Sequence, residues 1–418
     1  MNTTWRQCTI GDVCDTISNT YNSNAQQVVL INTSDVLEGK VLNHIYIPNE
    51  NLKGQFKKTF EEGDILYSEI RPQNKRYAYI DFAPINYIAS TKLMVIRNKN
   101  IVKSKYLYYF LQSDKIISEL QMLAETRSGT FPQITFNELS KLSIKIPPLP
   151  EQDRIISILD SICKKIDINQ QINDNLEQQA QALFKAWFVD FEPFRDGEFV
   201  NSVLGSTPKE LPITYIENIP HNIESGKRPK GGATLIGVPS IGAENIKGLG
   251  YYDYSKTKYI PEEYAQTIKK GKINGYELLI YKDGGKPGYF IPNFTIFGEG
   301  FPFNEMYINE HVFLLDLMDC GYNVFAYFYM QTPYIMNQLN SIGGKAAIPG
   351  INTKDVECLP IYSNESPYVK KFGEIVLPFI KTILSNSLEN AKQAKVRDTL
   401  LPKLMSGELK INEIETEK

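Results

Sequence analysis

Two stretches of the chain carry apolar residues at alternating spacings of four and three, which is the pattern of a helix that buries one narrow seam against another helix. The first stretch covers 151–188, and the second begins at Pro367. Pro150 and Pro367 suit helix starts, because a proline in the first turn gives up no intrahelical hydrogen bond. The seam positions are Ile155, Leu159, Ile162, Ile166, Asn169, Asn173, Leu176, Ala180, Leu183 and Trp187, and then Phe372, Val376, Phe379, Ile383, Asn386, Asn390, Gln393, Arg397, Leu400 and Leu404.

Each predicted seam contains two asparagines, Asn169 and Asn173 in the first helix and Asn386 and Asn390 in the second. An amide in an apolar seam costs stability, but it penalises a slipped register because only one alignment lets the amides hydrogen-bond to each other. We therefore expect these four side chains to pair the two helices. The alternative is that each helix packs on its own domain and the asparagines face solvent.

The regions before the two helices contain short runs rich in Val, Ile, Leu and Tyr, which are typical of β-strands. The pattern predicts two β-rich α+β domains, at 1–148 and 205–362, each followed by a helical segment, at 149–204 and 363–418. A linker is expected around 194–197 and 207–208. The clearest strand-like runs are Val28–Ile31, Asp64–Tyr67, Lys92–Ile96 and Glu277–Tyr281.

The second half of the chain repeats the first. The blocks Phe131–Ile134 and Ile348–Ile351 are similar, and the alignment that places Pro132 on Pro349 also places Asn169 on Asn386 and Asn173 on Asn390. Two other matching blocks need slightly different offsets, which small insertions explain. Those blocks are Tyr109–Ser113 with Phe328–Thr332, and Leu66–Glu69 with Ile280–Asp283.

The composition narrows the class of protein. A chain of 418 residues that is 42% hydrophobic is long enough for two folded domains. No apolar run is long enough to span a bilayer and the first residues do not form a signal peptide, so we expect a cytoplasmic protein without membrane contact. Five scattered cysteines and three histidines offer no zinc-ligand spacing or disulfide framework. We expect no metal, and reduced, mostly buried thiols.

Catalytic mechanisms cannot be assembled from the motifs. Phe297–Gly300 is a poor imitation of a methyltransferase cofactor loop, and Pro147-Pro148 is a poor imitation of its base pocket. Asp64 and Glu69 lack a partner acid for a nuclease metal site. The net charge of −3 restricts any DNA-binding face to a local patch.

The first candidate for such a patch is a polar loop after a predicted strand. Arginine matches the O6 and N7 atoms of guanine, and the amides of Gln and Asn match the N6 and N7 atoms of adenine. The alternative is an ordinary solvated loop. The candidate residues are Arg71, Gln73, Asn74, Lys75 and Arg76.

Further candidates lie at repeated positions or in basic runs. Lys282 and Lys286 belong to a glycine-rich loop that could approach phosphates but lacks the order of a P-loop. Lys57-Lys58 and Lys269-Lys270 are expected to be ordinary surface charge. The other candidates are Arg127, Ser128 and Gln133 in the first half, Lys345 and Asn352 in the second, and the basic run Lys227, Arg228 and Lys230.

Three motifs in combination resemble the specificity (S) subunits of type I restriction-modification systems, and the resemblance covers nearly the whole chain. The second repeat departs from the pattern where Asn364–Pro367 replaces the proline-rich segment of the first. The motifs are Ile146-Pro147-Pro148-Leu149-Pro150-Glu151-Gln152, Leu183-Phe184-Lys185-Ala186-Trp187-Phe188-Val189-Asp190-Phe191-Glu192-Pro193, and Arg397-Asp398-Thr399-Leu400-Leu401-Pro402-Lys403-Leu404-Met405-Ser406-Gly407-Glu408-Leu409.

The resemblance implies an α+β protein with two target recognition domains, each reading one half of a split double-stranded DNA sequence. It also implies two helical spacers that form an antiparallel coiled coil and bind the partner subunits of a complex that acts in host defence. The chain itself would hold no cofactor and catalyse nothing. S-adenosylmethionine, ATP and Mg²⁺ would be used by a methylation subunit, in two copies, and by a restriction and translocase subunit.

The expected helix length suits this role. Residues 151–188 would span about 57 Å, against about 34 Å for one turn of B-DNA. The sequence therefore predicts a two-part target with a fixed gap. Two alternatives stay open, namely a tandem DNA-binding protein that acts alone and a fused adenine methyltransferase.

Overall fold

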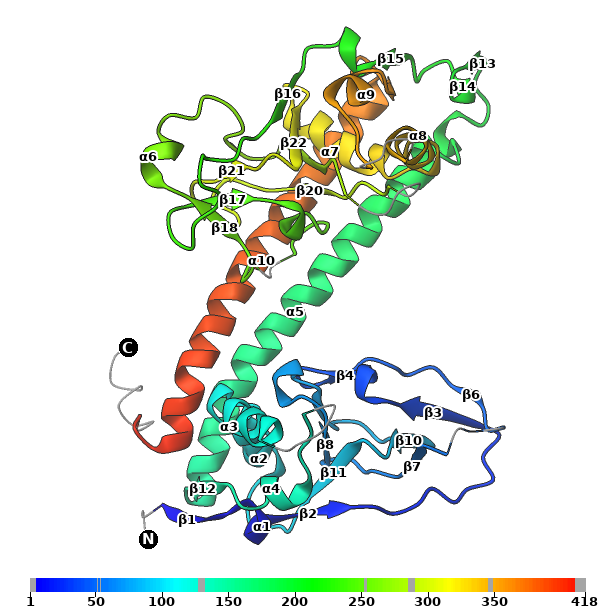
Figure 1. The fold of residues 1–418 in the computed structure, drawn as a ribbon. Coiled ribbons are helices and arrows are strands. Elements are labelled where there is room, and N and C mark those ends of the chain that lie inside the picture. The colour runs from blue at the N-terminus through cyan, green and yellow to red at the C-terminus, as the bar shows by residue number, and fades with distance from the viewer. Residues whose placement is uncertain are drawn as a thin grey trace. The chain divides into compact units, whose positions relative to one another are not determined.

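The computed structural model describes residues 5–50, 52, 54–126, 132–251, 254–284, 290–344 and 349–409. It divides into two compact units, of which unit 1 comprises 1–164 with 393–418 and unit 2 comprises 165–392. Both boundaries fall inside long helices, so each unit contains part of α5 (Leu149–Phe188) and part of α10 (Pro367–Ser406) (Figure 1). The two long helices predicted from the heptad pattern are therefore confirmed.

Unit 1 is built on two four-stranded sheets, with the strand orders β2-β11-β8-β9 and β6-β3-β10-β7. Two short pairs, β1-β12 and β4-β5, complete its strands. Helix α2 packs on β11. The bounds are β1 (Arg6–Thr9), α1 (Ile10–Val13), β2 (Cys14–Ile17), β3 (Gln27–Ile31), β4 (Val36–Leu37), β5 (Lys40–Val41), β6 (Ile47–Pro48), β7 (Phe56–Lys58), β8 (Ile65–Ser68), β9 (Tyr77–Tyr79), β10 (Tyr87–Ser90), β11 (Leu93–Asn98), α2 (Ser104–Leu111), α3 (Asp114–Glu125), α4 (Phe136–Leu139) and β12 (Ser143–Ile146).

Unit 2 repeats this plan. Its sheets have the orders β16-β22-β19-β20 and β18-β17-β21, with the pairs β15-β23 and β13-β14 beside them, and α7 packs on β19 and β20. The bounds are β13 (Phe199–Ser202), β14 (Gly205–Pro208), β15 (Ile213–Tyr215), β16 (Asn222–Ser225), β17 (Val238–Ile241), β18 (Lys258–Ile260), α6 (Glu262–Ala265), β19 (Leu278–Tyr281), β20 (Phe294–Ile296), β21 (Tyr307–Ile308), β22 (Val312–Asp316), α7 (Cys320–Met330), α8 (Pro333–Gly343), α9 (Thr353–Glu357) and β23 (Pro360–Tyr362).

The strands form where the sequence carries continuous apolar runs. All four residues of β8 are buried, as are the first four of β11, so these two strands form the centre of a sheet that is covered on both faces. The four runs that the sequence marks as strands coincide with β3, β8, β11 and β19. The prediction of β-rich α+β units is confirmed. The sequence could predict these strands because a short continuous apolar run is a strand signal, as a period-2 pattern is.

The two long helices contribute to the core of each unit. In unit 1, Ile155 and Leu159 of α5 share one buried cluster with Leu401 and Leu404 of α10. In unit 2, aromatic rings from both helices meet α7, with Phe325 packed edge-on against Phe188 and Phe372 at ring-centroid distances of 5.0 and 6.0 Å. Apolar positions of the long helices thus face both the partner helix and the other elements of their unit, which explains their continuous apolar character.

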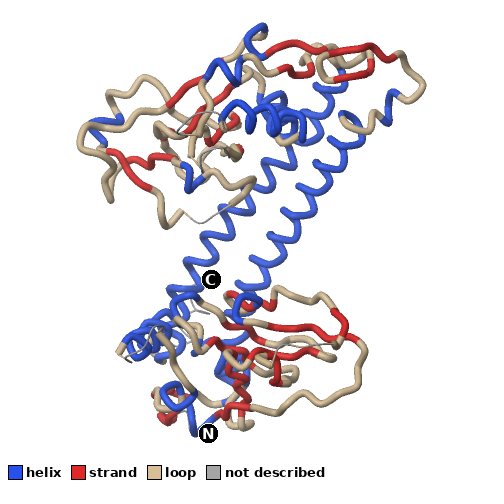
Figure 2. The backbone as a smooth tube through the Cα atoms, turned by 45° about the vertical axis from the view of Figure 1, so that its right-hand side comes forward, coloured by secondary structure: helices blue, strands red, loops and turns tan. Residues whose placement is uncertain are grey.

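Inside unit 2 the helices pair antiparallel through their asparagines. The Nδ2 atom of Asn169 donates to Oδ1 of Asn390 at 2.8 Å, and Nδ2 of Asn386 donates to Oδ1 of Asn173 at 2.9 Å. A step of four residues along α5 is matched by a step of four back along α10, as an antiparallel register requires. Both views show the two helices side by side within this unit (Figures 1 and 2). The four asparagines therefore face each other rather than solvent.

The cysteines correct one expectation. All five are free thiols, but Cys320 and Cys358 are exposed and Cys8 and Cys163 are partly buried, so only Cys14 is fully buried. Burial raises the pKa of Cys14 to about 12. The prediction of mostly buried thiols was wrong because apolar neighbours in sequence do not reveal which face of a helix end is covered.

Candidate nucleic-acid interface

In unit 1, two loops that the sequence marked as candidates lie side by side. The loop after β8 contains the short 3-10 helix η2 (Pro72–Asn74), and both flanking residues, Arg71 and Lys75, have positive φ angles of 47° and 52°. Arg71 N donates to the carbonyl oxygen of Pro132 at 3.1 Å, and Ile134 N donates to that of Glu69 at 2.8 Å. These bonds hold the polar loop against the segment that begins the repeated Pro132 block.

Unit 2 builds the same bridge from its own sequence. Gly284 N donates to the carbonyl oxygen of Pro349 at 2.9 Å, and Ile351 N donates to that of Lys282 at 2.8 Å. The loop after β19 thus meets the second copy of the proline block as the loop after β8 meets the first. Each unit therefore presents one pair of loops at an equivalent place in its fold.

The bridge corrects the alignment of the two halves by one position. Glu69 N donates to the carbonyl oxygen of Lys92 at 3.0 Å, and Lys282 N donates to that of His311 at 3.1 Å. Lys92 directly precedes β11, and His311 directly precedes β22. Glu69 is therefore equivalent to Lys282, whereas sequence similarity places it on Asp283. The sequence similarity aligns Tyr67 with Tyr281, but strand pairing places the two tyrosines one position apart. Tyr281 pairs with Val312, the first residue of β22, whereas Tyr67 pairs with Met94, the second residue of β11.

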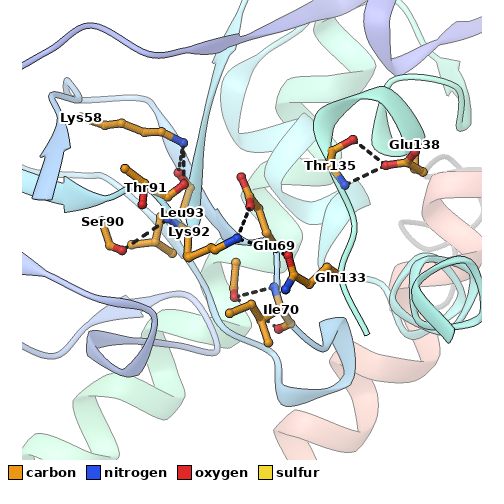
Figure 3. A network of polar contacts seen from close by, with 11 residues as sticks. Lys58, Glu69, Ile70, Ser90, Thr91, Lys92, Leu93, Gln133, Thr135 and Glu138 are labelled. Atoms are coloured by element: carbon orange, nitrogen blue, oxygen red, sulfur yellow. Dashed lines mark hydrogen bonds and ion pairs between the residues drawn. The ribbon is translucent and has the colours of Figure 1, made fainter. Parts of the chain in front are cut away.

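A polar network surrounds the bridge in unit 1 (Figure 3). The ammonium group of Lys92 lies 3.7 Å from the carboxylate of Glu69 and donates to Oε1 of Gln133 at 3.2 Å. The side chain of Lys92 is 48% exposed and that of Glu69 is 20% exposed. Because an ammonium group has only donors, the carbonyl oxygen of the Gln133 amide must face Lys92. The amide nitrogen of Gln133 then lies on the side of the amide group that is turned away from the Lys92 ammonium group.

Lys58 belongs to the same region and corrects the expectation of ordinary surface charge. Its ammonium group donates to the carbonyl oxygens of Thr91 and Leu93, at 3.0 and 2.8 Å, and the side chain is partly buried (Figure 3). Burial lowers the pKa of Lys58, an effect that Glu69 opposes and Lys92 reinforces. Lys57, Lys269 and Lys270 are exposed as expected. Alternation along β7 explains the difference, since neighbouring side chains point to opposite faces.

The other candidates of the first loop differ in what they contact. Arg76 donates to the carbonyl oxygens of Ser34 and Val36 at 3.0 and 3.3 Å, and Lys75 forms an ion pair with Asp114 at 3.2 Å. These two cations are thus held by the protein. Arg71, Gln73 and Asn74 have exposed side chains.

In unit 2, two of the four candidate cations within the described ranges, Lys282 and Arg228, contact neighbouring side chains. Lys282 donates to Oγ of Ser225 at 2.9 Å and lies 4.5 Å from the ring centre of Phe313, and burial lowers its pKa, opposed by Asp283 and Glu310. Arg228 pairs with Glu310 at 2.5 Å. Lys227 and Lys230 are exposed.

Asn352 has a structural task. It is the N-cap of α9, where its Oδ1 atom accepts from Asp355 N at 3.1 Å and its own N–H donates to Oδ2 of Asp355 at 2.8 Å. Thr135 and Glu138 form the same capping box at the start of α4. A cap satisfies backbone groups that a helix start leaves unpaired. Four further candidates, Arg127, Ser128, Lys286 and Lys345, lie outside the described residues.

The acidic residues weighed for metal catalysis are engaged otherwise. Asp64 is 2% exposed and accepts two hydrogen bonds from Arg97, at 2.8 and 2.7 Å. Within the described ranges, no three His, Cys, Asp or Glu side chains lie close enough together to hold a metal ion. Among the helices of the described ranges, none combines the length and the apolar character needed to cross a membrane.

Comparison with known proteins identifies the family. The type I restriction enzyme HindI specificity subunit of Haemophilus influenzae is 34% identical to this chain over 97% of the chain and 99% of the relative. The chain belongs to the type I restriction enzyme specificity subunits. Residues 2–178 match the model of the family described as "Type I restriction modification DNA specificity domain".

One further relative and one solved structure are similar to this chain. The MjaIX specificity subunit of Methanocaldococcus jannaschii is 28% identical over 79% of this chain and 77% of its own length. The solved S subunit of a type I restriction-modification system from M. genitalium aligns with 97% of this chain and 96% of its own, at a TM-score of 0.54 and 17% identity. That likeness concerns the fold.

Sequence reasoning missed three parts of the candidate interface of this specificity subunit. It did not predict that Lys92 contacts Gln133 or that Lys58 contacts the backbone of Thr91 and Leu93, because these contacts join segments far apart in the chain. It also did not foresee that Asn352 caps a helix. A signal existed for the cap, since Asn352 is followed three residues later by Asp355 and a short apolar run.

Proposed function

We propose that each unit of this specificity subunit reads one half of a two-part double-stranded DNA sequence through its own pair of bridged loops. The observation that carries the proposal is the duplicated bridge, in which the loop after β8 meets Pro132 and the loop after β19 meets Pro349. Two copies of one recognition fold in a single chain suit two half-sites, since each copy can carry different side chains on the same backbone.

The chemistry at the equivalent positions supports independent reading. Where unit 1 has Glu69, Lys92 and Gln133, unit 2 has Lys282, His311 and Gly350. The first set offers an amide whose oxygen is held by Lys92 and whose nitrogen can donate, whereas the second offers a histidine held 2.8 Å from Asp283. Base edges are told apart by their pattern of donors and acceptors, so the two units would prefer different bases.

In this proposal, partner subunits carry out the chemical reactions of the complex. The specificity subunit is non-catalytic by family. A methylation subunit using S-adenosylmethionine, in two copies to match the two repeats, would modify adenine. A restriction subunit using ATP and Mg²⁺ would cleave and translocate DNA. The helices α5 and α10 are the elements we expect to dock these partners.

The fixed gap of the target would follow from the helices. The 40 residues of α5 correspond to a rise of about 60 Å, compared with about 34 Å for one turn of B-DNA. A paired helix is stiff and its asparagine bonds fix the register, so the helices suit the task of a spacer.

Co-expression with the methylation subunit of the same restriction-modification system tests the proposal against its alternatives. We expect a stable complex that binds DNA with an affinity that falls steeply as salt concentration rises. The isolated chain should bind no S-adenosylmethionine in calorimetry. Binding of that cofactor by the chain alone would favour a fused methyltransferase, and sequence-specific DNA binding without any complex would favour a protein that acts alone.

A further inference from the structure

The same corner of the fold is unusual in both units. It consists of the loop before an inner strand of the second sheet of each unit, β3 in β6-β3-β10-β7 and β17 in β18-β17-β21, together with the neighbouring strand, β6 or β18 (Figure 1). The strand pairings establish the equivalence. Strand β3 pairs parallel with β10 and antiparallel with β6, and β17 pairs parallel with β21 and antiparallel with β18.

In unit 1 this corner is an open polar hollow of about 650 Å³. Its lining includes the amide side chains of Asn24, Gln26, Gln27 and Asn49 and one carboxylate, that of Glu50. Asn49 is fixed through a hydrogen bond from its Nδ2 atom to the carbonyl oxygen of Ala25 at 2.9 Å. Side chains of this kind offer both donors and acceptors to a polar ligand.

In unit 2 the corner is apolar at its tip. Leu235 is 93% exposed and Ile236 is 86% exposed, whereas the next most exposed large hydrophobic side chain in the described ranges, Ile45, is 72% exposed. Single exposed apolar residues are common on protein surfaces. Two adjacent aliphatic side chains in almost full contact with water are not explained by folding, because neither contributes to a core.

The loop that carries these two residues is anchored on both sides. A Cβ atom at Gly226 would lie 1.9 Å from the carbonyl oxygen of Ile308, and one at Gly237 would lie 2.1 Å from that of Ile260, so both glycines pack directly on neighbouring backbone. Thr234 exchanges backbone hydrogen bonds with Tyr259, at 2.8 and 3.1 Å. The tip therefore projects from a fixed base, and little conformational freedom remains to be lost on binding.

The charges of the loop favour DNA as the occupant. Lys227 and Lys230 are exposed and lie in the same loop as the apolar tip. The guanidinium group of Arg228 is already paired with Glu310. Proteins that unstack DNA place Leu, Ile or Phe side chains between neighbouring bases and hold the adjacent phosphates with Lys or Arg. A protein partner would be expected to match the apolar pair without two lysines beside it.

We propose that Leu235 and Ile236 form an apolar wedge that inserts against the stacked bases of the half-site read by unit 2, with Lys227 and Lys230 on the flanking phosphates. The inference rests on the proposed function and adds a mode of reading to it. Unit 1 would contact DNA at the equivalent corner through its amides, and unit 2 would read how easily a base step unstacks.

The test uses the complex with the methylation subunit and the DNA sequence that this complex methylates. A 2-aminopurine base, which fluoresces more strongly when unstacked, is placed in turn at positions of the second half-site other than the methylated adenine, since methyltransferases flip that base themselves. The wild-type complex should raise the fluorescence at one step. The double variant Leu235→Asn/Ile236→Asn should abolish the rise and weaken binding about tenfold.

Two control variants separate the effect of the apolar tip from that of substitution in general. Leu235→Met/Ile236→Met keeps an apolar tip and should keep the signal. Met318→Asn removes another exposed apolar side chain of unit 2, at a positive φ of 61° that asparagine tolerates, and should leave binding unchanged.

Each contrary outcome has a distinct meaning. A wild-type complex that methylates no sequence would overturn both the proposed function and the wedge. A complex that methylates a two-part sequence without any fluorescence change, or with a change that survives the Asn substitutions, would overturn the wedge alone. Loss of assembly with the methylation subunit in the Asn variant would also overturn it, because the tip would then be a protein contact.

Discussion

At the scale of single residues, the orientation of Gln133 is set by a property of lysine. The ammonium group of Lys92 can only donate, so it holds the carbonyl oxygen of the Gln133 amide and leaves the amide nitrogen as the donor for another partner. Glu69 balances the charge of Lys92 from the other side. An amide fixed in this way offers donors to a base edge, which suits the O6 and N7 acceptors of guanine.

This orientation leads to a prediction for Gln133 and Lys92. Gln133→Glu replaces the amide donors with an acceptor and should weaken binding to the target by about tenfold or more, because one good contact to a base edge is worth on the order of 1–3 kcal/mol. Lys92→Met frees the amide to rotate and should relax discrimination at one base pair. Competition binding with singly substituted targets measures both effects.

Lys103→Met is the matched control for Lys92. Lys103 also pairs with a carboxylate, that of Asp153 at 3.2 Å, and its side chain is 46% exposed, close to the 48% of Lys92. It should leave base discrimination unchanged. Unchanged affinity of the Gln133→Glu variant together with unchanged discrimination by the Lys92→Met variant would remove Gln133 from the interface.

Residue-scale features were the hardest to predict from sequence. The polar loop at 71–76 could be found because it follows a strand run and is rich in cations and amides. The exposure of Leu235 and the partial burial of Lys58 could not, because both depend on strand pairing between distant segments. Local composition does not record which side chains a neighbouring strand covers.

At the scale of elements, the long helices could be predicted almost completely. A heptad pattern sustained over ten positions has no strand interpretation, and α5 begins at Leu149, two residues before the predicted 151. The four asparagines also suggested pairing, since amides are rare in a seam unless they meet. The individual partners required the structure, which joins Asn169 to Asn390 and Asn173 to Asn386.

The asparagine pair of Asn173 and Asn386 should behave as a coupled unit. Asn386→Leu leaves the amide of Asn173 without this partner and should lower the free energy of unfolding by about 1–3 kcal/mol. The double variant Asn173→Leu/Asn386→Leu should recover part of the loss, because two apolar side chains can pack in the seam. Denaturant unfolding of both single variants and the double variant measures the coupling. Strictly additive losses would show that the amides do not depend on each other.

Helix length is the second property that belongs to this scale. Removal of one heptad from α5 together with the facing heptad of α10 keeps the seam in phase and shortens the pair by about 10.5 Å. This distance corresponds to roughly three base pairs of B-DNA. The variant should therefore recognise the same two half-sites with a shorter gap, or lose binding, as measured on a library of targets with varied gaps. An unchanged gap would contradict the spacer role.

At the scale of the whole molecule, the duplication of the fold is the main result. The repeat was visible in sequence at Pro132 and Pro349, and the structure extends it to the strand orders β2-β11-β8-β9 and β16-β22-β19-β20 and to the loop bridges. Sequence alone misplaced the block around Tyr67 by one position. Register in a sheet is decided by pairing with neighbours rather than by identity of single residues.

Independent units should exchange independently. Replacement of 205–362 by the corresponding segment of another specificity subunit should change one half of the recognised sequence and leave the other half as it was. The core of unit 2 includes Phe184 and Phe372 of the two helices, so the exchanged segment must keep aromatic or aliphatic partners for them. A change in both halves, in a chimera that still assembles and methylates, would show that the units read DNA jointly.

The measurement that tests the central claim most directly is a map of methylated adenines in genomic DNA. The chain and its methylation subunit are expressed together in a host without other adenine methylation, and the modified positions are read by single-molecule sequencing. The account predicts one two-part sequence with a constant gap, modified on both strands. Methylation at a single uninterrupted sequence, or at no defined sequence despite a stable complex, would contradict the claim that two repeated units each read one half of the target.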